Sequence, residues 1–149
     1  MSKNQTYKKR MVPIEKPTRE LYSLLIDARL TFQRDVRHTL WQYTVQEVRN
    51  MIGHIGVADN YPQLRESALS QFLAEFYKVS ADLKMYNEKG FLTQKVYLQA
   101  FPLMDSIERQ AKAWLTNTIN ARVGSNENGA AESVSYNKGG YPLSTERSS

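Results

Sequence analysis

The chain has 149 residues, which suits one domain with a buried core, since a domain usually holds roughly 100 to 200 residues. It contains no cysteine, so disulfides, cysteine-ligated metal centres and thiol nucleophiles are excluded. Twenty Lys and Arg oppose fifteen Asp and Glu, and the resulting modest charge of +5 suggests a polyanionic partner.

The start of the chain is polar and basic and is not followed by the apolar run of a secretion signal. No segment approaches the roughly 18 apolar residues of a membrane span. We therefore expect a cytoplasmic protein that does not enter a membrane.

Residues 1 to 17 are expected to form a flexible arm, because they contain Pro13 and Pro17 and little apolar periodicity. The arm also concentrates the positive charge. Residues 1 to 20 carry six Lys and Arg against two Glu.

Four amphipathic segments follow the arm, each with apolar residues at the spacing of one buried helix face. The first begins at a Thr18 cap and carries Leu21, Leu24, Leu25, Ala28 and Phe32; the second spans 34–57 with Leu40, Thr44, Val48, Met51, Ile52 and Ile55. The third spans 60–86, with a capping box of Asn60 and Gln63 and an inner face of Leu69, Phe72, Leu73, Phe76, Val79 and Leu83. The fourth begins after a Thr93 cap and carries Tyr97, Ala100, Phe101, Met104, Ile107, Ala111, Trp114, Leu115 and Thr118.

Two further features are expected along the fourth helix. Pro102 should kink it, because proline lacks a backbone donor and clashes with the preceding turn. After Arg122 the sequence is rich in Gly and Ser without apolar periodicity, which predicts a disordered tail over 123–149. Residues 18–122 are thus predicted to form an all-α, antiparallel up-down four-helix bundle.

Catalytic and metal-binding patterns are missing from the sequence. His38 and His54 are sixteen residues apart, whereas helical metal ligands lie three or four apart, and neither follows a Glu by three positions. There is no phosphate-binding glycine loop, no nucleophile elbow and no carboxylate pair on an apolar face. We expect no enzyme activity, no metal and no cofactor.

The aromatic residues divide into two groups. Phe72, Phe76, Phe101 and Trp114 lie on inward stripes, which favours core packing over base stacking. Trp41, Val45 and Tyr77 lie outside the main stripes and are expected to form an oligomer interface.

The basic residues are the remaining candidates for function. Lys8, Lys9 and Arg10 form a cluster on the arm, typical either of a phosphate-binding tail or of a solubilising one. Each basic residue of the predicted helices, taken alone, is an ordinary surface charge. Repeated in every subunit of an oligomer, these charges would together create a positive field that attracts nucleic acid. This second group comprises Arg29, Arg34, Arg37, Arg49, Lys78 and Lys84.

The stretch from Leu21 to Thr118 resembles a family of small four-helix bundles. The similar parts are Phe32-Gln33-Arg34, then Leu69-x-x-Phe72-Leu73-Ala74-Glu75-Phe76, and the closing Met104-x-x-Ile107-x-x-x-Ala111-x-Ala113-Trp114-Leu115. The family includes proteins encoded by intervening sequences of bacterial large-subunit rRNA genes and the accessory variability determinant of diversity-generating retroelements. Members commonly have a proline before the basic residue of the first break, where this chain has Gln33, so only Arg34 is carried over.

The resemblance implies a homopentamer that binds nucleic acid through basic surfaces and associates with the retroelement reverse transcriptase and its template RNA. Binding to RNA and DNA would then be electrostatic and tolerant of sequence. Two alternatives stay open: a bundle with an RNA- or ribosome-linked role and no reverse transcriptase partner, and a structural oligomer that binds only protein.

Overall fold

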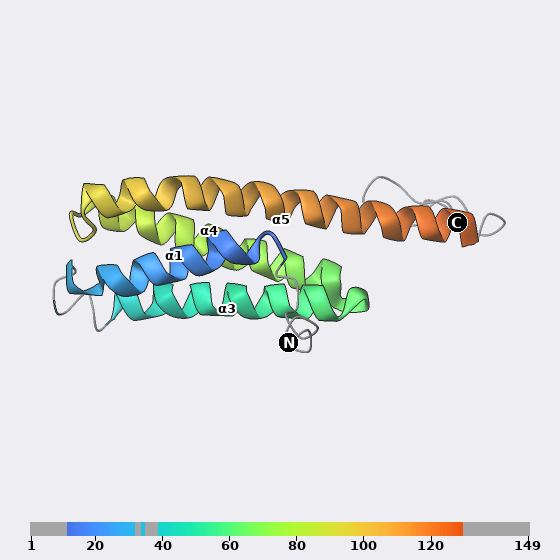
Figure 1. Cartoon of the computed structure of the whole chain (residues 1–149), viewed down its shortest axis with the longest axis horizontal. Helices are drawn as coiled ribbons and strands as arrows, with labels where there is room; N and C mark the ends of the chain where they lie inside the picture. Colours follow the sequence, from blue (N-terminus) through green and yellow to red (C-terminus); the bar gives the residue numbers. More distant parts are fainter. Residues whose placement is uncertain (1–11, 32–33, 35–38, 130–149) are drawn as a thin grey trace, which may run out of the picture.

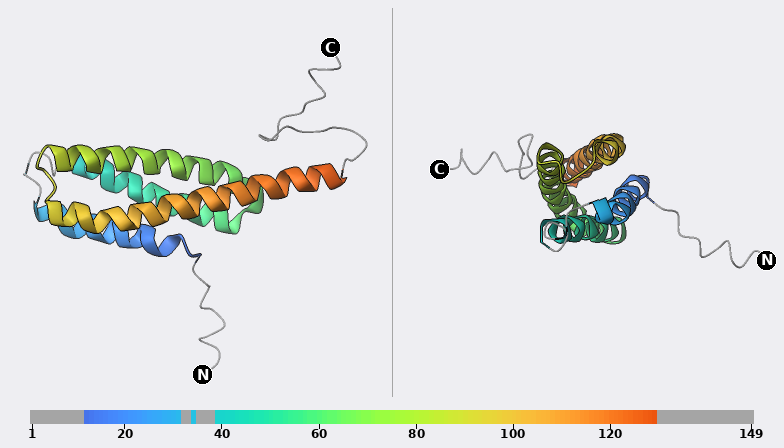
Figure 2. Two further views of the ribbon diagram at one scale, coloured as in Figure 1. Left: turned by 90° about the horizontal axis from the view of Figure 1, so that it is seen from above. Right: turned by 90° about the vertical axis from the view of Figure 1, so that its left-hand side faces the viewer.

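The computed structural model describes residues 12–31, 34 and 39–129. This part of the chain forms the α-helices α1 (Glu15–Asp27), α3 (Leu40–Asn60), α4 (Arg65–Glu88) and α5 (Gln94–Gly129), with short 3-10 helices η2 (Ala28–Thr31) and η3 (Pro62–Leu64). Each α-helix packs against the next, and α1 also packs against α5, which closes the ring (Figures 1 and 2). The predicted antiparallel four-helix bundle is confirmed.

The core consists of the apolar stripes of the four helices. Their spacing of three and four residues keeps one face of each helix turned inward, where it is removed from water. Among the described side chains, the apolar residues of these helices that are at most 2% exposed are Leu21 and Leu25 of α1; Val48, Met51, Ile55 and Ala58 of α3; Leu69, Phe72, Val79 and Leu83 of α4; and Ala100, Ile107 and Ala111 of α5.

Helix α1 begins earlier than the sequence suggested. Thr18 is not its cap but lies fully buried inside the first turns, where its hydroxyl donates to the Ile14 carbonyl at 2.8 Å. Pro17 is tolerated because it lies in the first turn of α1, where the backbone N–H groups have no helical acceptor, so the missing N–H of proline costs no hydrogen bond. The predicted arm of residues 1–17 is therefore too long at its end, and residues 1–11 lie outside the described part.

The turn between α3 and α4 also differs from the prediction. Helix α3 begins at Leu40 and continues through Asn60, whose side-chain amide donates to the Gly56 carbonyl, so Asn60 does not cap α4. Helix α4 begins at Arg65, with no side-chain cap. The Arg65 guanidinium instead donates to the carbonyls of Ala58 at 2.6 Å and Asp59 at 3.4 Å. A long side chain from α4 thus satisfies the carboxyl end of α3.

Helix α5 is longer than predicted at its far end. Thr93 caps it as expected, accepting a hydrogen bond from the Val96 backbone at 3.3 Å. The helix continues through Pro102 without interruption and ends at Gly129 rather than at Arg122 (Figure 1). Residues 123–129 were wrongly assigned to the tail, since a helix already nucleated extends at little cost per residue. Residues 130–149 lie outside the described part.

Near its far end, α5 is tied to the start of α4. The Arg122 guanidinium binds the Glu66 carboxylate through two nitrogens, at 2.7 and 3.2 Å. Among the helices described, none combines the length and apolar character needed to cross a membrane.

Candidate nucleic-acid interface

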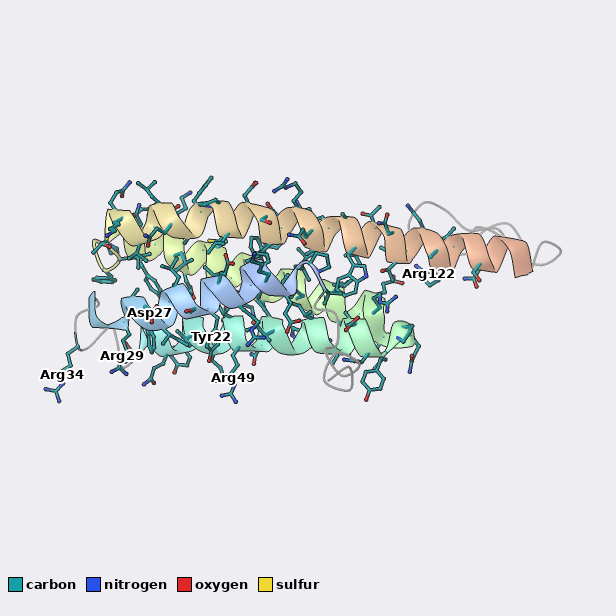
Figure 3. The ribbon with its side chains drawn as sticks, in the orientation of Figure 1. Tyr22, Asp27, Arg29, Arg34, Arg49 and Arg122 are labelled. Atoms are coloured by element: carbon teal, nitrogen blue, oxygen red, sulfur yellow. The ribbon has the colours of Figure 1, made fainter. Side chains whose placement is uncertain are left out.

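Three predicted arginines lie along one edge of the bundle. Arg29 belongs to η2, Arg34 lies between η2 and α3, and Arg49 lies on α3; all three are exposed. Arg29 and Arg49 each follow a buried residue, Ala28 and Val48, and the rotation per residue, about 120° in a 3-10 helix and about 100° in an α-helix, directs them outward. Figure 3 shows the three side chains pointing to the same side of the α1–α3 pair. We call them the arginine row.

The arginine row has the chemistry of a phosphate-binding surface. Within the described residues, none of the three guanidiniums forms an ion pair with a carboxylate. Each keeps five donors for phosphate oxygens. Phosphate contacts of this kind position a nucleic acid without reading its sequence.

Lys78 lies apart from the arginine row, on α4 beside acidic residues. Partial burial, assisted by the nearby carboxylates of Asp82 and Glu75, raises the pKa of Glu47 above its ordinary value, and Lys78 acts in the opposite direction. One Glu47 oxygen is buried without a hydrogen-bond partner. Because Lys78 acts on Glu47, which also interacts with Asp82 and Glu75, it lies in an acidic part of the surface and adds little to a field that attracts phosphate.

Lys84 lies in a groove between α4 and α5, also apart from the arginine row. The groove has a volume of about 360 Å³ and is lined by Phe76, Tyr77, Ser80, Lys84, Tyr97, Phe101, Met104, Asp105 and Glu108. We call it the α4–α5 groove. Its two carboxylates already have cationic partners on α5, since Arg109 pairs with Asp105 at 3.6 Å and Lys112 pairs with Glu108 at 3.3 Å.

Phe101, predicted to lie in the core, is 62% exposed. Its neighbour Ala100 is fully buried, and the next helical residue is rotated by about 100° toward solvent. Leu98, Phe101 and Asp105 form a separate stripe beside the core stripe of α5. The acidic residue on that stripe was the signal in the sequence that Phe101 faces outward.

The other aromatic predictions fare differently. Phe72 and Phe76 are in the core as predicted, whereas Trp114 is only half-buried beneath the Arg65 guanidinium, 5.6 Å from its ring centre. Among the proposed interface residues, Trp41 and Val45 are half-buried against the core of their own chain, and the Trp41 indole donates to the Leu25 carbonyl at 3.0 Å. Tyr77 is the exposed member of that set, at 46%.

The remaining candidates are placed as follows. Lys8, Lys9, Arg10, Arg37 and His38 lie outside the described residues. His54 is half-buried and lines a groove between α3 and α4 with Arg49. Within the residues that the structure describes, no three His, Asp or Glu side chains are grouped so as to hold a metal ion.

Comparison with known proteins yields no relative: no family model, no curated protein and no solved structure matches this chain.

Proposed function

We propose that this protein is a non-enzymatic, nucleic-acid-binding accessory subunit. In this proposal it associates, as a cytoplasmic homopentamer, with the reverse transcriptase of a diversity-generating retroelement and with the template RNA during mutagenic copying. The stretch from Leu21 to Thr118 resembles that bundle family, and the proposed partner and the pentameric state are taken from this resemblance. The observation that supports nucleic-acid binding is the arginine row, in which three exposed guanidiniums share one edge of the bundle and form no ion pair with any described residue.

The physical basis of binding is the release of counterions from the phosphate backbone. Each phosphate that a guanidinium neutralises frees condensed cations, and for single strands the slope of log affinity against log salt changes by about −0.7 per contact. If all three arginines of one protomer engage, the row accounts for a slope of about −2. An oligomer would repeat this contribution around its surface and raise the avidity.

The test is a salt titration of RNA binding by a variant in which Arg29, Arg34 and Arg49 are all replaced by Gln. We expect weaker binding to every sequence and a slope shallower by about 2 units. A matched control replaces three exposed lysines elsewhere, Lys16, Lys89 and Lys95, by Gln, which removes the same charge but leaves the arginine row. Equal effects of the two triple variants would refute a role for the row.

The proposed partner requires its own test. The protein is co-expressed with the reverse transcriptase encoded beside it and captured by affinity, with and without nuclease treatment. Recovery of the polymerase supports the accessory role. RNA binding through the arginine row without recovery of any polymerase would favour the alternative of an RNA- or ribosome-linked bundle.

A further inference from the structure

The α4–α5 groove is walled by aromatic rings that face solvent. Phe101 is 62% exposed and Tyr77 is 46% exposed, from opposite walls. The half-buried Tyr97 also lines the groove and packs against the core. Exposed aromatic rings on one face of a monomer are uncommon unless a partner covers them. The groove therefore offers flat apolar surfaces to a ligand.

Tyr77 is held in a defined position. Its ring packs edge-on against Phe76, with ring centres 5.4 Å apart. Its hydroxyl lies close to the Glu108 carboxylate and lowers the pKa of that carboxyl. A ring fixed in this way loses little conformational entropy when a ligand stacks on it.

The described residues that line the groove include one cation, Lys84, and two carboxylates, Asp105 and Glu108, whose cationic partners lie outside the lining. Asp105 and Glu108 are matched by Arg109 and Lys112, whereas Lys84 makes no ion pair with any residue that the structure describes. A purely apolar partner, such as the hydrophobic face of a helix, would bury this ammonium without a counter-charge, which is costly. A ligand with both flat rings and negative charge satisfies the rings and the lysine together.

We propose that the α4–α5 groove binds an unpaired strand of nucleic acid, with bases stacked on Phe101 and Tyr77 and a phosphate at Lys84. This assignment rests on the proposed nucleic-acid function and specifies its ligand. A duplex is a poor ligand because its bases are already stacked on each other, whereas unpaired bases stack on aromatic side chains whatever their sequence. The arginine row then acts on phosphates at the other edge of the bundle.

The experiment compares two fluorescent oligonucleotides of about 12 nucleotides, a length typical of single-strand sites. One is oligothymidylate, and the other has the same phosphates and sugars but no bases. Replacing Phe101 by Ala should weaken oligothymidylate binding about tenfold and leave the abasic strand unaffected, because stacking requires a base. The substitution leaves no cavity, since most of the ring is already in solvent.

Two variants serve as controls. Leu98 lies on the same helix and is 60% exposed, but it does not line the groove, so Leu98→Ala should leave both affinities within about twofold. Phe101→Trp should retain the wild-type affinity for oligothymidylate, because it keeps an aromatic ring on which a base can stack. If Leu98→Ala costs as much as Phe101→Ala, general surface hydrophobicity explains the effect and the assignment fails.

Other results would overturn the assignment in different ways. If Phe101→Ala weakens both oligonucleotides equally or neither of them, while the arginine-row variant still flattens the salt dependence, the groove assignment fails and the proposed function stands. If the wild-type protein binds neither oligonucleotide, both the groove assignment and the proposed function fail. If Phe101→Ala leaves affinity unchanged but reduces the mass by light scattering, the groove is an interface between copies of the chain.

Discussion

The hydroxyl of Thr44 links α3 to α4 inside the bundle. Its removal tests how much this link stabilises the contact between the two helices. Thr44 is 1% exposed. Its Oγ1 lies 2.8 Å from an Asp82 carboxylate oxygen and 2.7 Å from the Tyr86 hydroxyl, which in turn donates to the Leu40 carbonyl at 2.8 Å. A carboxylate oxygen only accepts, so the single Thr44 proton goes to Asp82. The single Tyr86 proton is then shared between the Leu40 carbonyl and Thr44 Oγ1.

Thr44→Val keeps the shape of the side chain and removes this bridge. A hydrogen bond to a charged group contributes about 1.5 to 3 kcal/mol to the free energy of unfolding. Asp82 is only half-buried, so water partly replaces Thr44, and Tyr86 keeps the Leu40 carbonyl as an acceptor. We therefore expect a loss of about 2 kcal/mol, in the lower part of that range.

The assay is urea unfolding, with the free energy of unfolding obtained by linear extrapolation at an unchanged slope. Thr118→Val is the matched control, because among the described residues the Thr118 hydroxyl bonds only the Trp114 carbonyl of its own helix, at 2.7 Å. This variant should lose less than about 0.5 kcal/mol of the free energy of unfolding. Thr44→Ser should lose about 1 kcal/mol, since it retains the bridge and removes one methyl group. Equal losses at Thr44→Val and Thr118→Val would refute the assignment of stability to the bridge.

Two further predictions concern α3. Burial, with help from Asp82 and Glu75, raises the pKa of folded Glu47 above 4.5, so its ionised form costs stability at neutral pH and the cost disappears as pH falls through that raised pKa. Glu47→Gln should therefore increase the free energy of unfolding near neutral pH. Urea titrations below pH 4.5 should show no such increase, and an increase that does not depend on pH would contradict this reasoning. At Gly53 and Gly56 an added Cβ meets no atom within 4 Å, so replacing either glycine by Ala should stabilise the helix by about 0.5 to 1 kcal/mol, measured by thermal melting, and a lower melting temperature would show an unseen steric conflict.

Most of the fold could be predicted from the sequence because helix periodicity is a local property. The face of α4 that contains Phe72, Phe76, Val79 and Leu83 is buried as its spacing predicted. The ends of the helices were less predictable. The turn after Asn60 is closed by the Arg65 side chain reaching back to Ala58, an interaction that no local cap pattern indicates.

The candidate site was only partly predictable. Residue types identified the basic candidates, but the sequence does not show which of them gather. The structure groups Arg29, Arg34 and Arg49 on one edge and leaves Lys84 in a groove across the bundle. Glu47 of α3 interacts with Glu75, Lys78 and Asp82 of α4, and this approach of the two helices follows from packing alone.

The sequence by itself determined an all-α chain of four amphipathic helices with excess positive charge, because the spacing of apolar residues and the positions of Gly and Pro act within one helix. Only the tertiary structure decided which residues at the margin of each stripe are covered. Ala100 and Phe101 are both apolar and adjacent, yet the packing of α4 against α5 buries Ala100 and leaves Phe101 in solvent. The physical reason is that an apolar stripe specifies a face to within about 100°, whereas a helix–helix contact covers a narrower strip whose position depends on the neighbouring helix.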